Sequence, residues 1–144
     1  MPETDHGITK RDYEVLARFR TALRRFLRFS EEAARAAGLT PQQHQLLLAV
    51  QGMPGREWAT VRELADALQL QHHSVVGLVD RLEQLGLVAR RAHAADHRAV
   101  EVHLTPQGLR QLAALTAAHR AELRRMRAVW QELQALLEMS AAES

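Results

Sequence analysis

Nine residues between two short apolar stretches carry the most concentrated polar chemistry in the chain. The segment from Arg90 to Arg98 reads RRAHAADHR and holds three arginines, two histidines and Asp96. Arginine presents a planar fork of N–H donors that binds phosphate or guanine in bidentate fashion. A carboxylate two residues before Arg98 could orient its guanidinium or close a turn. The segment is too polar for a core, and its composition suits contact with a polyanion.

Two helices and two strands are predicted around this segment. Thr60 and Glu63 have the spacing of a capping box, which predicts a helix over 61–68 after the N-cap Thr60. A short turn over 69–71 leads to a second helix over 72–84, which ends at Gly86. Its apolar residues recur at helical spacing and are expected to be buried: Val75, Val76, Val79 and Leu82. Strands are predicted over 87–89 and 100–104, and Trp58 is expected to pin a short preceding strand against the core.

This order of elements is typical of a winged helix-turn-helix, in which the second helix enters a DNA major groove. The start of that helix would then meet base edges, and its candidate contacts are His72, His73, Ser74, Gly77 and, one turn on, Arg81. Gly77 is unusual, because glycine inside a helix costs about 1 kcal/mol relative to alanine. Either DNA approaches the backbone there, or a neighbouring helix packs tightly against it.

The same stretch resembles the MarR family of bacterial transcriptional regulators. The resemblance rests on LADALQLQHHSVVGLVDRLEQLGLVAR, on DHR and on VHLTPQG, the last two similar to the D-x-R and LT-x-x-G wing pattern of that family. The wing positions are Asp96, Arg98, Leu104, Thr105 and Gly108. The resemblance implies that Arg98 enters the minor groove and that Arg90 and Arg91 meet phosphates. Thr60 is also placed in the DNA-binding set.

The fold implied is mainly α with a small antiparallel β-wing, a winged helix-turn-helix core flanked by long N- and C-terminal dimerisation helices. We expect one MarR-like domain over 1–144, with the DNA-binding region at about 40–106. Apolar residues recur at gaps of three and four in the terminal regions, at about 8–37 and 109–138. A helix of about thirty residues is about 45 Å long and overhangs so small a domain. Its excess length predicts a homodimer, although both stripes could instead pack on the domain's own core.

Composition narrows the function further. The chain has 144 residues, is 47% hydrophobic and lacks cysteine. No apolar run is long enough to span a membrane, and the polar start is no signal peptide, so we expect a cytoplasmic protein. The net charge is only +2, and every basic residue except Lys10 is arginine. That bias suits DNA binding, but a GC-rich genome would produce it equally well.

The function predicted is therefore a sequence-specific DNA-binding transcriptional regulator and not an enzyme. We expect a homodimeric repressor on a pseudo-palindromic duplex, released by a small aromatic or anionic effector, with no cofactor. Phe19, His44 and His119 are the candidate effector residues, although core packing is their ordinary role. Two histidines fall short of the three or four ligands of a zinc site, so no metal is assigned. The alternatives are a metal-responsive regulator of the same fold and a winged helix that binds only proteins.

Overall fold

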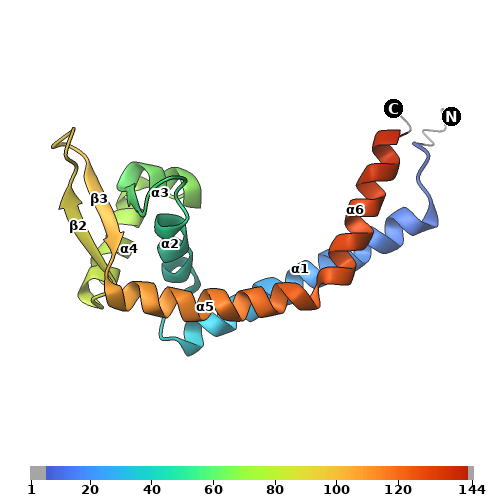
Figure 1. The fold of residues 1–144 in the computed structure, drawn as a ribbon, viewed down its shortest axis with the longest axis horizontal. Helices are drawn as coiled ribbons and strands as arrows, with labels where there is room; N and C mark the ends of the chain where they lie inside the picture. The colour runs from blue at the N-terminus through green and yellow to red at the C-terminus, as the bar shows by residue number, and fades with distance from the viewer. Residues whose placement is uncertain (1–5, 143–144) are drawn as a thin grey trace. The chain divides into compact units, whose positions relative to one another are not determined.

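The computed structural model describes residues 6–142, which form six helices and one three-stranded sheet (Figure 1). The elements are α1 (Lys10–Ala36), α2 (Pro41–Gln51), β1 (Trp58–Thr60), α3 (Val61–Leu68), α4 (His72–Gln84), β2 (Val88–Ala92), β3 (Val100–Leu104), α5 (Pro106–Arg125) and α6 (Arg127–Ala142). They group into two compact units. The winged-helix unit comprises residues 31–117, and the helical unit comprises residues 6–30 and 118–142. Within the described residues, no helix combines the length and the apolar character that crossing a bilayer requires.

Local sequence signals account for the helix boundaries in the winged-helix unit. Thr40 caps α2 and Thr60 caps α3, each in a full capping box with the residue three positions on. Gly86, at φ 74°, follows the end of α4 in the left-handed conformation that glycine adopts most easily. The predicted bounds of α3 and α4 are confirmed to the residue.

The sheet has the order β1-β3-β2, and all of its pairs are antiparallel. The prediction for β2 was wrong at both ends, because the strand runs from Val88 to Ala92. Arg90 and Arg91 therefore lie in a strand and not in the loop. Figure 1 shows β2 and β3 as a hairpin beside α4.

The core of the winged-helix unit lies between its helices and one face of the sheet. Its fully buried side chains include Leu46, Leu64, Val79, Leu82 and Val102. In α4 the expectation for Val76 was wrong, since Val76 is half-buried and Leu78 packs in the core. Apolar contacts thus fix the buried face of α4, and its opposite face points away from the core.

The helical unit contains the N-terminal part of α1, the end of α5 and all of α6. The single C-terminal helix expected at about 109–138 is divided in two, because α5 ends at Arg125 and α6 begins at Arg127. Met126 at this break is buried. Phe19 packs edge-to-face on Trp130 at 5.8 Å between ring centroids, and Arg18 binds Glu132 at 2.9 Å. These contacts join α1 to α6 within the helical unit.

Candidate nucleic-acid interface

The outward face of α4 carries the residues predicted to read base edges. His72, His73 and Arg81 are exposed, while Ser74 and Gly77 are half-buried. The other face of the helix is held in the core by Val75, Leu78, Val79 and Leu82. Because the buried face is rigidly packed, the polar face is presented in one orientation.

Gly77 distinguishes the two explanations offered from the sequence. A Cβ built at this position meets no atom within 4 Å apart from the helix's own backbone and neighbouring residues. Tight packing by another helix is therefore wrong as an explanation. Close approach of DNA to the helix backbone stays a prediction.

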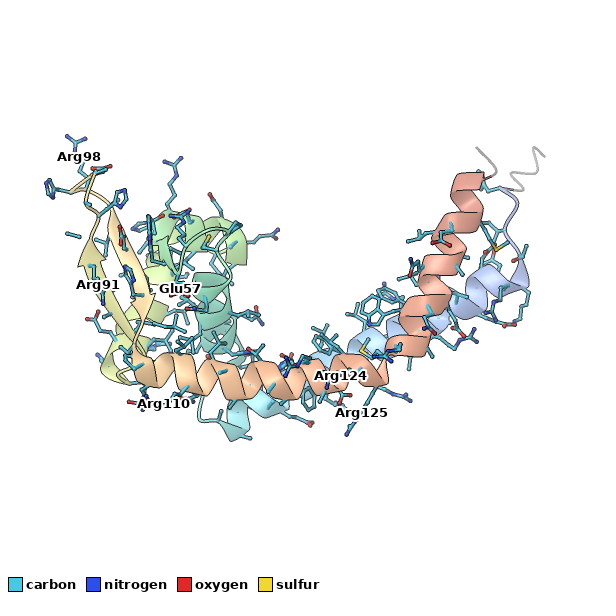
Figure 2. All side chains as sticks on the ribbon, in the orientation of Figure 1. Glu57, Arg91, Arg98, Arg110, Arg124 and Arg125 are labelled. Atoms are coloured by element: carbon cyan, nitrogen blue, oxygen red, sulfur yellow. The ribbon has the colours of Figure 1, made fainter. Side chains whose placement is uncertain are left out.

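The tip of the wing is a seven-residue loop over 93–99 between β2 and β3. Asp96 closes the turn, because its Oδ1 accepts the backbone N–H of Arg98 at 3.0 Å and its carbonyl accepts that of Ala99 at 3.1 Å. Asp96 thus shapes the backbone around Arg98 and does not pair with its guanidinium in any contact described. The Arg98 side chain is exposed and points away from the wing (Figure 2). The Arg98 guanidinium therefore lies as an exposed positive charge at the end of the hairpin.

Arg90 has partners within the protein, in contrast to the phosphate contact expected of it. Its guanidinium binds Asp80 at 2.5 Å and Glu83 at 3.3 Å, and it also reaches the carbonyl of Val76 at 3.5 Å. All three partners lie on α4. Arg90 therefore connects the wing strand β2 to the predicted recognition helix. Arg91, the next residue, is exposed.

Thr60 acts in the structure as a helix cap. Its hydroxyl oxygen accepts the Glu63 backbone N–H at 3.2 Å, and the Glu63 carboxylate accepts the Thr60 backbone N–H at 3.0 Å. Glu63 also forms an ion pair with Arg56. Burial raises the pKa of Glu63, but the hydrogen bonds from Thr60 and Arg56 outweigh burial and lower this pKa below its ordinary value.

A polar cluster on the outer face of the sheet was missed by the sequence analysis. Trp58 contacts His93 at 5.2 Å and His103 at 6.3 Å between ring centroids, and the Arg56 guanidinium lies 4.2 Å from the Trp58 ring centre. Trp58 therefore packs on histidines of the wing. The short strand expected at Trp58 is present as β1, but its residue facing the core is Ala59 and not Trp58. The alternation of residues in 100–104 was the available signal, since it placed Glu101 and His103 on one face.

Glu101 lies at the centre of this cluster, which we call the wing-base cluster (Arg56, Trp58, His93, Glu101 and His103). His93 and His103 both donate to its carboxylate, Nδ1 to Oε2 at 2.6 Å and Nε2 to Oε1 at 2.8 Å. These two hydrogen bonds outweigh the effect of burial and lower the pKa of Glu101. The carboxylate is thus kept ionised as an acceptor for both rings.

The LTPQG segment fastens the base of the wing to α5. Thr105 donates its backbone N–H to the Leu87 carbonyl at 3.0 Å and its hydroxyl to the Gly86 carbonyl at 2.6 Å. A Cβ on Gly108 would lie 2.0 Å from the Leu87 oxygen. Only glycine lets the first turn of α5 approach this backbone so closely.

The three candidate effector residues take part in separate contacts. Phe19 packs on Trp130, whereas His119 packs on Phe26 and Phe29 and lies 2.8 Å from the Ser30 hydroxyl. His44 is buried in α2, which belongs to the winged-helix unit. No group of three or more side chains suited to a metal ion occurs in the described part of the chain.

Comparison with known proteins bears on the winged-helix unit directly. The sequence model of the MarR family matches residues 37–99. Residues 37–99 are therefore similar to the MarR family. The matched region contains α2, α3 and α4, together with β2 and the wing loop. The predicted family resemblance is confirmed, and the family is one of transcriptional regulators.

Two curated proteins are similar to this chain over part of its length. A putative transcriptional regulatory protein for the hcr operon of Thauera aromatica is 30% identical over 93 residues, 65% of this chain and 54% of that protein. The HTH-type transcriptional repressor MdtR of Bacillus subtilis (strain 168) is 30% identical over 77 residues, 54% of this chain and 48% of that protein. The chain therefore spans about half the length of the curated relatives it matches.

The fold is shared with solved structures over most of the chain. A MepR F27L mutant of S. aureus, solved bound to an oligodeoxyribonucleotide, superposes with a TM-score of 0.64 at 22% identity. The match covers 92% of this chain and 98% of that one. The mainly helical fold with a small antiparallel sheet is thereby confirmed.

Proposed function

We propose that this chain is a MarR-type, sequence-specific DNA-binding transcriptional regulator, a homodimeric repressor that acts in the cytoplasm. The observation that carries the proposal is that the winged-helix unit has two exposed polar surfaces, one on α4 and one at the tip of the wing. The outward face of α4 carries His72, His73 and Arg81, and the wing ends in the exposed Arg98. The ion pairs of Arg90 with α4 support a fixed spacing between these surfaces.

In this proposal α4 enters the major groove and Arg98 enters the adjacent minor groove, where narrow A·T-rich DNA has a more negative potential. Arg91 meets the phosphate backbone. Arg90 is a positioning residue, because its guanidinium is already bound to Asp80 and Glu83. Thr60 supports the interface only through the α3 cap.

The helical unit supports the dimeric part of the proposal. Large apolar side chains in this unit are exposed by 39–66%. They are Ile8, Tyr13, Leu16, Leu27, Leu123, Trp130, Leu137 and Met139. A second copy of the chain would remove this apolar surface from water. Two copies would also present two α4 helices, which matches a pseudo-palindromic duplex of two half-sites.

Release by a small aromatic or anionic effector completes the proposal. It is supported only by the aromatic contacts of the helical unit, in which Phe19 packs on the exposed Trp130 and His119 packs on Phe26. Addition of an effector should lower the affinity for the selected duplex without dissociating the dimer. We place no metal in this mechanism.

The test is selection of bound duplexes from a random DNA pool at physiological salt, with the oligomeric state measured by light scattering. We expect a dimer that enriches an inverted repeat with half-sites about 10 base pairs apart. Affinity for that duplex should fall steeply as salt rises, because phosphate contacts release counterions. A folded protein that enriches no sequence would refute the regulator proposal and favour a winged helix that binds proteins.

The matched variants are R98A and R110A, each of which removes one exposed arginine from the winged-helix unit. Arg110 lies on α5 (Figure 2) and has no proposed contact with DNA. R98A should weaken binding at least tenfold, while R110A should change it less than about twofold. Equal effects of the two variants would mean that only net charge matters.

A further inference from the structure

The wing-base cluster contains an acidic residue where a polyanion-binding hairpin would ordinarily avoid one. Glu101 lies in the central strand β3, and only 13% of its side chain is exposed. Glutamate is a poor strand former, and burying a carboxylate is unfavourable unless it is hydrogen-bonded. Its place in the sheet therefore requires a structural reason.

The sheet register explains how Glu101 meets its partners. Within β3, Val102 is fully buried, so Glu101 and His103 project from the opposite face. Trp58 is paired with His103 across β1 and β3, while Arg91 of β2 is paired with Glu101. Side chains of directly paired residues share a face. This face therefore carries the indole, the carboxylate and one imidazole together.

The second imidazole bound to Glu101 belongs to His93, the first residue of the wing loop. Its ring reaches back along the hairpin to Glu101, and its backbone N–H donates to the Ala99 carbonyl at 3.2 Å. The loop over 93–99 is thus fixed at its base by one side chain and by one backbone bond. Arg98 lies one residue before Ala99, so the direction in which it leaves the hairpin depends on this base.

The Trp58 indole packs against both imidazoles that bind Glu101. Arg56 covers the indole while it is bound to Glu63 of α3. Hydrogen bonds to an ionised group are stronger when water is kept away. The cluster consequently links the wing loop to the capped start of α3.

We propose that Glu101 is a positioning residue of the wing, which holds the loop over 93–99 through His93 and His103 so that Arg98 is presented to DNA. The expected effect on DNA binding rests on the proposed function. The ordering of the loop over 93–99 by Glu101 is a property of the free protein and does not depend on it. It assigns His93 and His103 to the support of the wing and not to contact with bases.

The geometry makes a spectroscopic prediction that does not involve DNA. An ionised carboxylate only accepts hydrogen bonds, and a neutral imidazole has one N–H. His93 must therefore carry its proton on Nδ1, and His103 must carry its proton on Nε2. Nitrogen-15 NMR of the imidazoles at pH 8 should show these two opposite tautomers in the wild-type protein.

The test compares E101Q with E57Q, a control that removes one exposed carboxylate beside β1 (Figure 2). In E101Q the amide has an oxygen that accepts and an NH2 group that donates, so the ring that faces the NH2 group can stay bonded only by moving its proton to the other ring nitrogen. We expect loss of one of the two wild-type tautomer signals and faster backbone motion in residues 93–99. E57Q should retain the wild-type tautomers and loop order. If E101Q also retained both, the proposal would be overturned.

The effect on DNA is tested in a double-mutant cycle with R98A on the selected duplex. E101Q should weaken binding about tenfold, the scale of one hydrogen bond to a charged group. In the R98A background, E101Q should have less than a twofold further effect, because Glu101 acts through Arg98. Additive effects would overturn the proposal.

Two outcomes separate this inference from the proposed function. If R98A bound DNA as tightly as the wild type, the proposed function would fail, whereas loss of loop order in E101Q would still support the hold on the wing. If E101Q did not fold, H93A would replace it, because His93 lies in the loop and outside the core. H93A should then reproduce both the disordered loop and the weaker binding, and wild-type behaviour would overturn the proposal.

Discussion

Replacement of Gly77 by alanine should make the free protein more stable and its complex with DNA weaker. Gly77 lies inside α4, where alanine is preferred by about 1 kcal/mol. The added methyl group meets nothing within 4 Å, so no steric loss opposes this gain. For a chain of this size, 1 kcal/mol corresponds to a rise in Tm of about 4 °C.

The DNA measurement tests why glycine is present at all. If the helix backbone contacts the groove, the methyl group displaces α4 from the bases, and G77A should bind the selected duplex at least tenfold more weakly. That loss corresponds to about 1.4 kcal/mol. Thermal unfolding and fluorescence anisotropy titration on the same preparation give both numbers. A higher Tm with unchanged affinity would refute close approach of DNA, and a lower Tm would refute the open environment of Gly77.

Replacement of Gly108 by alanine should have the opposite effect on stability to replacement of Gly77. A Cβ there would lie 2.0 Å from the Leu87 carbonyl oxygen, which already accepts the Thr105 N–H. The backbone cannot move away without breaking that hydrogen bond. G108A should therefore destabilise the fold by about 3 kcal/mol, the upper range of overpacking, and lower the Tm by about 12 °C. A G108A protein as stable as the wild type would contradict the close packing of α5 on this loop.

Three further predictions concern charged groups. R98A should weaken DNA binding at least tenfold and leave the Tm unchanged, because this side chain has no structural partner among the contacts described. A lower Tm in R98A would mean that Arg98 stabilises the fold. R90A should lower both the Tm and the DNA affinity. In a double-mutant cycle of urea unfolding, R90A and D80A should show a coupling energy of about 1 kcal/mol, because the ion pair between Arg90 and Asp80 is partly exposed. A coupling energy of zero would mean that this ion pair does not hold the wing to α4. The lowered pKa of Glu63 contributes stability that is full above the unfolded value near 4.5 and is lost as the pH falls through the lower folded value. The difference in urea midpoint between wild type and E63Q should therefore shrink from pH 6 to pH 3, and a constant difference would contradict the shift.

The elements that the sequence predicted well are those with local signals. The bounds of α3 follow from its capping box at Thr60, and the end of α4 follows from Gly86. Both signals act within four residues, so they can be read without knowing the fold. The break between α5 and α6 carries neither glycine nor proline, and the apolar residues at gaps of three and four continue across Met126. Nothing in the local sequence marked it.

The candidate interface was predictable in outline, because it follows from the order of the elements. The helix after the turn supplied His72, His73 and Arg81, and the hairpin supplied Arg98, all on the protein surface as expected. Their roles toward DNA stay predictions, since they depend on a partner that the chain alone does not provide.

The partners of individual charges were decided by tertiary structure. From the sequence, Arg90 and Arg91 are equivalent neighbours in a basic segment. In the sheet their side chains point to opposite faces, so Arg90 meets the acidic residues of α4 while Arg91 stays exposed. The same pleat brings Glu101 between His93 and His103 and sets Trp58 over them. Sequence fixes which groups a strand carries, but strand pairing over long separations determines which of them meet.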